Sequence, residues 1–429
     1  MNQGNDVIII GAGAAGLMAA LELAKSGLKI LILEATTQVG GRIDTLRKVG
    51  FSQSVEAGAE FVHGELPFTM QLLKEAGLSY TATRGDFLQH NNGIIKEQQD
   101  FITGSEKLEK PLKELSHDMP VADFLNSHFP GEEDAEMRRT VTQFIEGYEA
   151  ADIQRASTMA MRGDLIEDDK EQYRIDGGYI QLVNYLEKKC LEYNCSIRLS
   201  EPVKEIKWEK GKVKVYTTTA TYHAAKTLLT VPIAILQEKT NNDDTIRFSP
   251  AIGHKTNAAR VLGAGQVIKF LLEFKTPFWK ENDATKNMGF IFSEQTIPTW
   301  WTQAPKESTL LTGWLGGPKA GDMKTLSDEA LLDVALTSLS NIFNTTASAL
   351  KEQLQTWHVA NWQMLPFAGC AYSYATVGAK EAIDELNKPE SGTLFFAGEA
   401  THTGNATGTV EAALASAVKV VKEILNSRI

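Results

Sequence analysis

The sequence is poor in cysteine, and this excludes two classes of protein. Only Cys190, Cys195 and Cys370 occur in 429 residues. They are too few and too unevenly spaced for a disulfide framework or a cysteine-based zinc site. We therefore expect no metal centre, and we expect the protein to reside in the reducing cytoplasm.

The sequence also lacks a long hydrophobic run. No stretch approaches the roughly 18 uninterrupted apolar residues of a membrane-spanning helix. The last segment, 411–429, contains Lys419, Lys422 and Arg428, and the start lacks the basic residues and the cleavage site of a signal peptide. The sequence thus predicts neither a membrane span nor export.

Positive charge is scarce as well. Lysine and arginine number 43 against 54 acidic residues, for a net charge of −11, and no basic run occurs. Neither a nucleic-acid backbone nor an anionic lipid surface would be attracted to such a chain. The hydrophobic content of 43% and charged content of 23% are typical of a globular protein, and the length predicts roughly two or three domains.

The first 34 residues have the pattern of a strand, a glycine turn, a helix and a second strand. In the turn GAGAAG, Gly11 permits a tight bend, Gly13 lets the backbone approach a pyrophosphate and Gly16 lets helix and strand pack closely. Glu34 follows the second strand, at the spacing from which a carboxylate holds ribose hydroxyls. Together these features predict a dinucleotide site. The expected elements are a strand over 6–10, a helix over 14–26 and a strand over 29–33.

Later segments alternate between strand-like and helical patterns. Residues 87–149 have apolar residues at helix-like spacing and are expected to form a mostly helical insertion. Ser327 is expected to cap a helix. Strands are expected within 196–231 and over 266–274, 289–292, 310–314 and 394–397, and helices over 328–343 and 409–425. Because strand-rich pieces recur along the whole chain, we expect two interleaved domains.

Three motifs carry a resemblance to a known family. The glycine fingerprint is followed by the sequence GGR at 40–42, then by EAGAEFVHG at 56–64 and, near the end, by FAGEATHTGNATGTVEAAL at 396–414. In this order they resemble the flavin-containing amine oxidases of the monoamine and polyamine oxidase kind. Segments 174–186, 201–206 and 230–236 are also similar to family segments, so the resemblance spans nearly the whole chain.

This resemblance implies a fold of mixed α/β and α+β class. A glutathione-reductase-type Rossmann domain that binds FAD would be interleaved with a substrate domain made of a mixed sheet and helices. The implied FAD-binding domain comprises 1–86, 175–240 and 390–429, and the implied substrate domain comprises 87–174 and 241–389, with a helical insertion at about 103–165.

The resemblance also implies how FAD is held. Arg42 would lie at the diphosphate, Val203 would meet the adenine through its backbone, and Glu399 would accept hydrogen bonds from ribityl hydroxyls or water. The helix that starts near Thr409 would direct its N–H groups at the flavin. The expected cofactor-binding residues are Gly11, Gly13, Ala14, Gly16, Glu34, Ala35, Gly41, Arg42, Gly58, Ala59, Val203, Val231, Trp362, Gly398, Glu399, Thr409 and Val410.

Lys269 is the strongest candidate for chemistry outside the cofactor site. It stands in the apolar strand-like sequence VIKFLL, where an unpaired ammonium would be costly to bury. The resemblance assigns it the role of holding a water beside flavin N5. The alternative is a lysine at a sheet edge whose ammonium reaches solvent.

Aromatic residues are expected on the substrate side. By resemblance, Tyr372 and Trp362 lie beside the amine and the flavin, while Thr409 stands where the family's second aromatic wall falls. His63 would also face the substrate and could exchange a proton near neutral pH. The expected catalytic residues are Lys269, Tyr372, Trp362, His63 and Thr409. Core packing is the alternative, and the favoured one for Tyr374, while Trp300 and Trp301 could equally line the entrance or pack in the core.

Cys370 falls in the segment where monoamine oxidases carry a flavin thioether. Here the sequence is CAY rather than CY. We favour a small buried thiol and a non-covalently bound FAD over attachment at this cysteine.

The resemblance implies FAD-dependent oxidation of an amine at the carbon next to nitrogen, with hydride passing to flavin N5. Dioxygen would then reoxidise the flavin to give hydrogen peroxide, and water would hydrolyse the imine to a carbonyl compound. Primary or secondary amines, polyamines among them, are the expected substrates, and a homodimer is left open. The alternatives are an L-amino-acid oxidase or desaturase of the same fold, or a non-redox sugar-nucleotide mutase that binds FAD.

Overall fold

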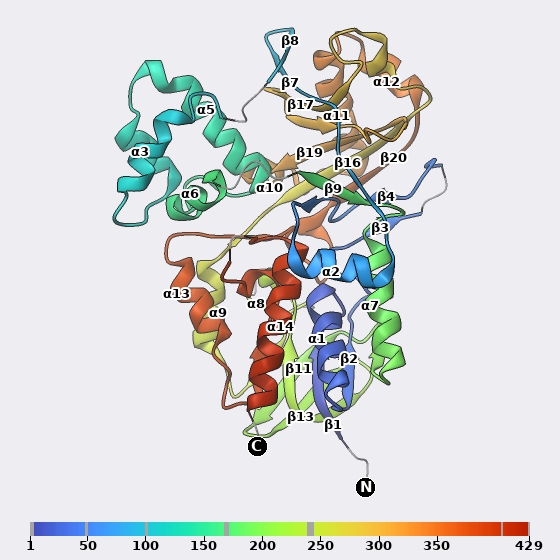
Figure 1. Ribbon diagram of the computed structural model, residues 1–429, viewed down its shortest axis with the longest axis vertical. Coiled ribbons are helices and arrows are strands. Elements are labelled where there is room, and N and C mark those ends of the chain that lie inside the picture. The colour runs from blue at the N-terminus through green and yellow to red at the C-terminus, as the bar shows by residue number, and fades with distance from the viewer. Residues whose placement is uncertain are drawn as a thin grey trace.

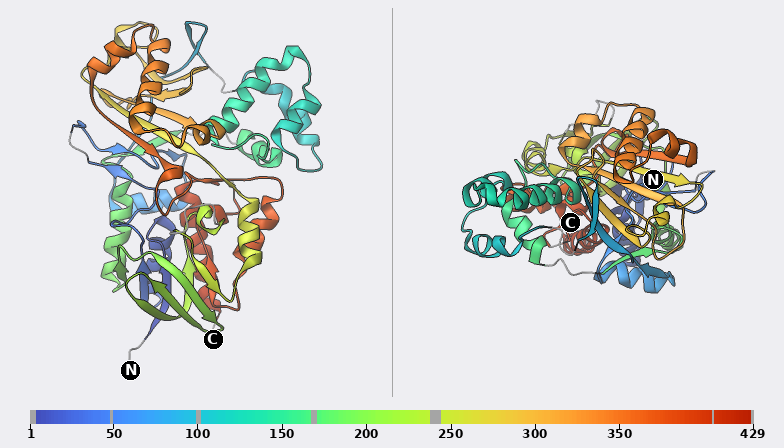
Figure 2. Two further views of the ribbon diagram at one scale, coloured as in Figure 1. Left: turned by 180° about the vertical axis from the view of Figure 1, so that it is seen from behind. Right: turned by 90° about the horizontal axis from the view of Figure 1, so that it is seen from above.

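The computed structural model describes residues 4–47, 50–98, 102–166, 171–237, 244–404 and 406–427. Figure 1 shows an elongated molecule in which both termini lie at one end, beside a large sheet, and a second sheet occupies the other end. A group of helices, α3 to α6, stands to one side of the second sheet, as the views from behind and from above confirm (Figure 2).

The first sheet contains the N-terminal strand. Its order is β10-β2-β1-β13-β12-β11-β14, and β22 also pairs with β13. Strands β10, β2, β1, β13 and β22 run parallel, whereas β13, β12 and β11 are antiparallel. The bounds are β1 Asn5–Ile10, β2 Ile30–Leu33, β10 Ser196–Arg198, β11 Val203–Glu209, β12 Lys212–Thr217, β13 Thr221–Leu229, β14 Arg247–Ser249 and β22 Leu394–Phe396.

Helices cover both faces of this sheet. Val7 and Ile9 of β1 belong to one core with helices α1, α7 and α14, whereas Ile8 and Ile10 belong to a second core with α8, α9 and α13. Strand β1 is therefore apolar on both faces, as expected of a covered parallel strand. The helices are α1 Ala14–Lys25, α7 Ile180–Glu192, α8 Ile233–Leu236, α9 Gly253–Val261, α13 Ala379–Asn387 and α14 Val410–Asn426.

The second sheet has β16 in its interior. Its order is β20-β16-β19-β18-β17-β7-β8, and all eight residues of β16 are buried. Ile268 and Phe270 pack with α11 and α12, whereas Val267 and Leu271 join a different core on the opposite face. Because side chains alternate along a strand, Lys269 shares the face of Val267 and Leu271. The bounds are β7 Asp86–Asn91, β8 Ile94–Glu97, β16 Val267–Phe274, β17 Met288–Ser293, β18 Thr299–Trp301, β19 Leu310–Gly316, β20 Leu354–Asn361, α10 Pro318–Met323, α11 Asp328–Ile342 and α12 Ala347–Gln353.

The segment 87–149 differs from the expectation of a mostly helical insertion, because it opens with the hairpin of β7 and β8. Asn92 and Gly93 occupy its turn with positive φ angles of 49° and 79°, as an Asn-Gly turn favours. Strand β7 pairs in parallel with β17, about 200 residues further on, and this tertiary pairing overrides the local pattern. Helices follow: α3 Glu106–Glu114, α4 Val121–His128, α5 Ala135–Gln143, a π-helix over Phe144–Tyr148 and α6 Thr158–Ile166.

Short elements connect the two large sheets. They include a three-stranded sheet in the order β5-β9-β6 and the pairs β3-β4 and β15-β21. Their bounds, with that of α2, are β3 Thr45–Leu46, β4 Val55–Glu56, β5 Val62–His63, β6 Tyr80–Ala82, β9 Gln172–Ile175, β15 Gly263–Ala264, β21 Ser373–Tyr374 and α2 Pro67–Ala76.

Other local expectations are confirmed. Ser327 caps α11, because its side chain accepts a hydrogen bond from the N–H of Ala330. The domain division stays a prediction. Its boundary at 240/241 lies outside the described residues, and β14, which falls in the predicted substrate domain, pairs with β11 of the first sheet.

Candidate active site

A cavity of about 1040 Å³ lies between the two sheets and the π-helix. Its walls come from the loop after β1, the segment before β5, the face of the second sheet that carries Lys269 and the N-terminus of α14. Every predicted cofactor-binding or catalytic residue lines it except Gly16: Gly11, Gly13, Ala14, Glu34, Ala35, Gly41, Arg42, Gly58, Ala59, His63, Val203, Val231, Lys269, Trp362, Tyr372, Gly398, Glu399, Thr409 and Val410.

Each glycine of the first loop is required for a different structural reason. Gly16 sits inside α1, where an added Cβ would lie 2.0 Å from the carbonyl oxygen of Gly11, so it serves close packing of helix on strand. Gly11 has φ of +105°, which other residues rarely adopt. Gly13 lines the cavity. A Cβ added to it would have its nearest protein atom, the carbonyl oxygen of Gly40, 3.8 Å away.

Glu34 holds this loop in place. Its Oε2 accepts the N–H of Ala12 at 2.7 Å, and its Oε1 accepts both the N–H and the hydroxyl of Thr36 at 2.9 Å. A carboxylate offers about four lone-pair positions. These bonds use three, so Glu34 keeps acceptor capacity at the cavity wall.

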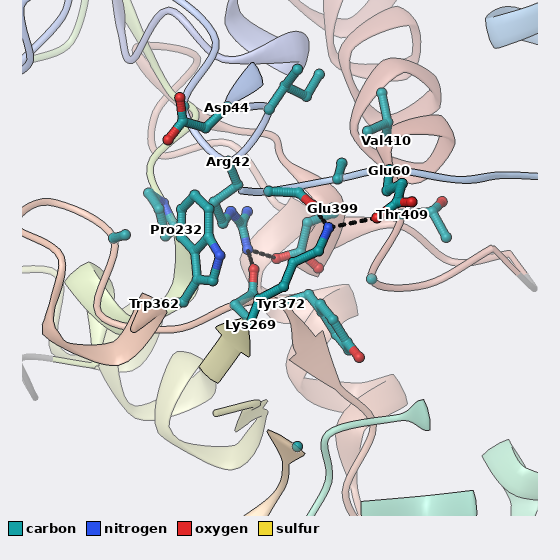
Figure 3. Close-up of a pocket in the computed structure, with 18 of the residues that line it drawn as sticks. Arg42, Asp44, Glu60, Pro232, Lys269, Trp362, Tyr372, Glu399, Thr409 and Val410 are labelled. Atoms are coloured by element: carbon teal, nitrogen blue, oxygen red, sulfur yellow. Dashed lines mark hydrogen bonds and ion pairs between the residues drawn. The ribbon is translucent and has the colours of Figure 1, made fainter. Parts of the chain in front are cut away.

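Arg42 and Glu399 join the two ends of the chain at the cavity. The guanidinium Nη1 lies 2.8 Å from Oε1 of Glu399 and donates to the carbonyl of Ala371 at 2.9 Å. The hydroxyl of Ser373 donates to Oε2 of Glu399 at 2.5 Å. Figure 3 shows this ion pair at the wall. It aligns the GGR loop with the C-terminal loop.

Thr409, which stands where the family's second aromatic wall falls, is the N-cap of the last helix. Its side chain accepts the N–H of Ala412 at 3.2 Å and donates to the carbonyl of Ala406 at 2.6 Å. Helix α14 thus presents its N-terminus to the cavity, lined there by Val410 and Ala413, while Ala412 is fully buried.

The cavity has the donors that a dinucleotide requires. The helices α1 and α14 both begin at its wall, and the first N–H groups of a helix have no partner within the helix and favour an anion. Gly13 and Gly41 leave space for close approach of a phosphate, and Glu34 stands ready for hydroxyls. The residues present therefore fit a flavin dinucleotide.

Lys269 is buried and paired. It is 1% exposed, in the interior of the sheet between β19 and β20, so the alternative of an edge lysine reaching solvent is wrong. Its Nζ lies 2.8 Å from Oε2 of Glu60 (Figure 3). It also donates to the carbonyl of Gly58 at 3.2 Å and stands 5.6 Å from the ring centre of Trp301.

Glu60 is a residue of the cavity wall that the sequence reasoning missed. Besides Lys269 it accepts Nε of Arg174 at 2.8 Å and Nε1 of Trp301 at 3.0 Å. Burial raises its pKa, but the charges of Lys269 and Arg174 outweigh burial and lower the pKa to about 2. The sequence signal that could have identified Glu60 is that it stands as a single charged residue between Ala59 and the apolar pair Phe61 and Val62.

Aromatic rings line the cavity beside Lys269. Tyr372 stacks on Trp314 with ring centres 6.4 Å apart and planes inclined by 18°, and its hydroxyl donates to the carbonyl of Tyr148 at 2.6 Å. Trp362 donates to the carbonyl of Ala57 at 2.9 Å. The hydroxyl of Tyr372 is thereby bound to backbone, while the residue lines the cavity.

The remaining aromatic candidates divide between wall and core. Trp301 lines the cavity. Trp300 is fully buried and donates to the carbonyl of Ile297, and the ring of Tyr374 is buried where a Cβ on Gly263 would meet it. Trp300 and Tyr374 therefore belong to packing.

His63 lines the cavity but does not titrate near neutral pH, contrary to expectation. Burial lowers its pKa to about 4. Its Nδ1 lies 3.4 Å from the hydroxyl of Tyr148. His63 is thus a neutral hydrogen-bonding group at pH 7.

Cys370 is fully buried in the core that contains Ile10 and Phe396 of the first sheet. This placement favours the interpretation as a small packed thiol.

Comparison with known proteins agrees with this geometry. Residues 14–425 match the model of flavin containing amine oxidoreductases. The chain belongs to this family. The resemblance inferred from the sequence motifs is thereby confirmed.

Relatives of this flavin-containing amine oxidoreductase include demethylases and oxidases. It is 29% identical over 438 residues to lysine-specific histone demethylase 2 of Homo sapiens, covering 92% of this chain and 50% of that protein. It is 25% identical over 457 residues to polyamine oxidase 4 of Oryza sativa subsp. japonica, covering 98% of this chain and 89% of that protein. The chain thus spans about half the length of the human demethylase.

Solved structures of similar fold include two amine oxidases. Putrescine oxidase bound to putrescine superposes with a TM-score of 0.81 at 20% identity, and cyclohexylamine oxidase from Brevibacterium oxydans IH-35A with 0.82 at 19%; each match covers 99% of both chains. The predicted mixed α/β fold class is confirmed. No described helix of this oxidoreductase is long and apolar enough to cross a membrane.

Proposed function

We propose that the enzyme uses non-covalently bound FAD to oxidise an amine at the carbon next to nitrogen, and that dioxygen is the final acceptor. The observation that carries this proposal is the position of Lys269. Its paired ammonium stands at the cavity wall between the dinucleotide-type loops and the aromatic residues. Bound FAD would supply a two-electron acceptor, which dioxygen restores with formation of hydrogen peroxide.

The cavity residues divide the binding of FAD among them. The loop of Gly11 and Gly13 and the N-terminus of α1 face the diphosphate, and Glu34 accepts hydrogen bonds from ribose hydroxyls. The N-terminus of α14 favours negative charge at the flavin end. The proposed contacts are those predicted from the sequence, with Gly16 acting through packing instead.

The aromatic wall positions the amine. One ring face of Tyr372 stacks on Trp314, and the opposite face would offer a surface for the amine nitrogen, in either its charged or its neutral form. Neutral His63 accepts or donates a hydrogen bond without adding charge. Together these groups orient the C–H bond to be broken and keep water away from it.

The ammonium of Lys269 has one N–H group more than its two protein acceptors use. An ammonium carries three N–H groups, and Glu60 and the Gly58 carbonyl take two of them. We assign the third to a water molecule in the cavity. Through such a water, we propose, Lys269 acts on reoxidation by dioxygen more than on amine binding.

A panel of amines tests the proposal. Anaerobic addition of primary and secondary amines, polyamines included, should bleach the flavin absorbance of the purified holoenzyme, and air should restore it with one peroxide per turnover. Because hydride leaves the carbon of a neutral amine, the bleaching rate should rise with pH. The proposal is contradicted if none of these amines bleaches the flavin while an L-amino acid or a hydroxylated compound does.

A further inference from the structure

Four aromatic rings form a row across the second sheet, which we call the aromatic row: Phe87, Phe290, Trp301 and Trp314. They come from the adjacent strands β7, β17, β18 and β19, and Phe290 pairs in register with both Phe87 and Trp301. Successive ring centres lie 5.1, 5.9 and 6.1 Å apart. All four residues line the cavity.

The aromatic row links the reacting end of the cavity to its outer end. Trp314 stands directly opposite Lys269 in the strand register, and Lys269 is 1% exposed. Phe87, at the other end, is 36% exposed. Three strand spacings of about 4.8 Å make the row about 14 Å long. A small amine would cover only its inner end.

Two acidic residues beside these rings, Glu60 and Glu294, are paired with cations. Glu60, next to Phe61, binds the cations of Lys269 and Arg174. Glu294 lies two residues after Phe292, which stacks on Phe290, and its carboxylate is 3.4 Å from Arg139. A second positive charge placed along the row would therefore lose its hydration without gaining an unpaired anion from these carboxylates.

We propose that the aromatic row binds the body of the substrate, which is a monoamine whose reacting carbon bears an extended alkyl or aryl group. This inference rests on the proposed amine oxidation and specifies its substrate class. The nitrogen lies between Lys269 and Tyr372, and the apolar body runs outward along the rings toward Phe87. Diamines and polyamines of equal length are the weaker substrates.

A series of straight-chain primary amines tests the length of the row. From butylamine to decylamine, kcat/KM of the holoenzyme should rise by about fourfold per methylene, the value expected for burying one CH₂ group. The α,ω-diamine of each length should fall at least about tenfold below its monoamine. A flat series, or diamines that exceed monoamines, overturns the inference.

Binding without turnover gives an independent measurement. An amine whose carbon next to nitrogen carries no hydrogen cannot be oxidised there. Calorimetric titration of the holoenzyme with tert-alkylamines of increasing chain length should show the same gain in affinity. Equal affinity along the series contradicts the inference whatever the turnover data are.

Substitution at the exposed end locates the surface. Phe87→Ala should lower kcat/KM for decylamine at least about threefold more than for butylamine. The control Tyr80→Ala removes a ring that is 44% exposed and lies outside the cavity lining, and should leave the decylamine-to-butylamine ratio unchanged. Phe87→Glu supplies an unpaired anion and should shift preference toward the diamine.

The outcomes separate the two proposals. If no amine reduces the wild-type flavin, the proposed function fails. If short amines reduce it and neither chain length nor Phe87 matters, amine oxidation stands and the aromatic row is no substrate surface.

Discussion

The ammonium of Lys269 and the carboxylate of Glu60 form an ion pair at 2.8 Å, with the two residues 1% and 7% exposed. The two residues are 209 positions apart, on β16 and just before β5. Such a pair is costly to assemble but far costlier to break, since the remaining charge stays buried. Arg174 is a second cation on the same carboxylate, so the cluster depends on Glu60 most of all.

Glu60→Gln should destabilise the holoenzyme by about 3 kcal/mol, because it leaves two buried cations without their anion. Urea unfolding followed by tryptophan fluorescence measures this. The control Glu65→Gln changes an exposed carboxylate of the same segment and should stay within about 0.5 kcal/mol of wild type. Equal stabilities for the two variants would refute the role of Glu60.

The same carboxylate predicts a pH dependence of stability. Its pKa is lowered in the folded state to about 2, so its contribution is complete above the unfolded value of about 4.3 and is lost as pH falls toward 2. The stability difference between wild type and Glu60→Gln should thus be constant above about pH 5 and shrink on acidification. A difference that grows on acidification has the wrong sign and contradicts the pairing.

Lys269→Met removes the ammonium but keeps much of the side-chain volume. Arg174 still neutralises Glu60, so the variant should fold and retain FAD. Amine reduction of the flavin should be nearly unchanged, while reoxidation by dioxygen should slow by at least about tenfold, or about 1.4 kcal/mol of barrier. Stopped-flow measurement separates the half-reactions. An unchanged reoxidation rate would make Lys269 a structural residue.

Gly13→Leu should abolish flavin retention, because the side chain would project into the cavity where the first helix begins. The control Gly253→Leu adds the same side chain at the exposed first residue of α9, where no atom lies within 4 Å of the position a Cβ would take. Flavin absorbance per chain after gel filtration measures the effect. Full flavin content in Gly13→Leu would remove this loop from the cofactor site.

Acid precipitation should release the flavin into the supernatant. Cys370, the candidate attachment site, is fully buried within the core beneath the first sheet. A covalent link would be demonstrated instead if the flavin stayed with the precipitated wild-type chain but was released from the Cys370→Ser variant.

The dinucleotide loop and the capped helices could be predicted from the sequence because their determinants are local. Gly11, Gly16 and Glu34 act within one βαβ unit, and Ser327 and Thr409 accept hydrogen bonds from N–H groups three residues ahead. Turn geometry, helix capping and strand periodicity need only neighbouring residues. The family followed from motifs of the same local kind.

Tertiary structure alone decided which distant side chains meet. The strand pattern placed Lys269 in an apolar strand and demanded a partner, but only the packing of β16 against the segment before β5 identified Glu60. Likewise the hairpin of β7 and the aromatic row exist because β7 pairs with β17. His63 loses its titration near neutral pH through burial. Ion pairs, cross-strand contacts and desolvation depend on distances in space, which sequence spacing does not contain.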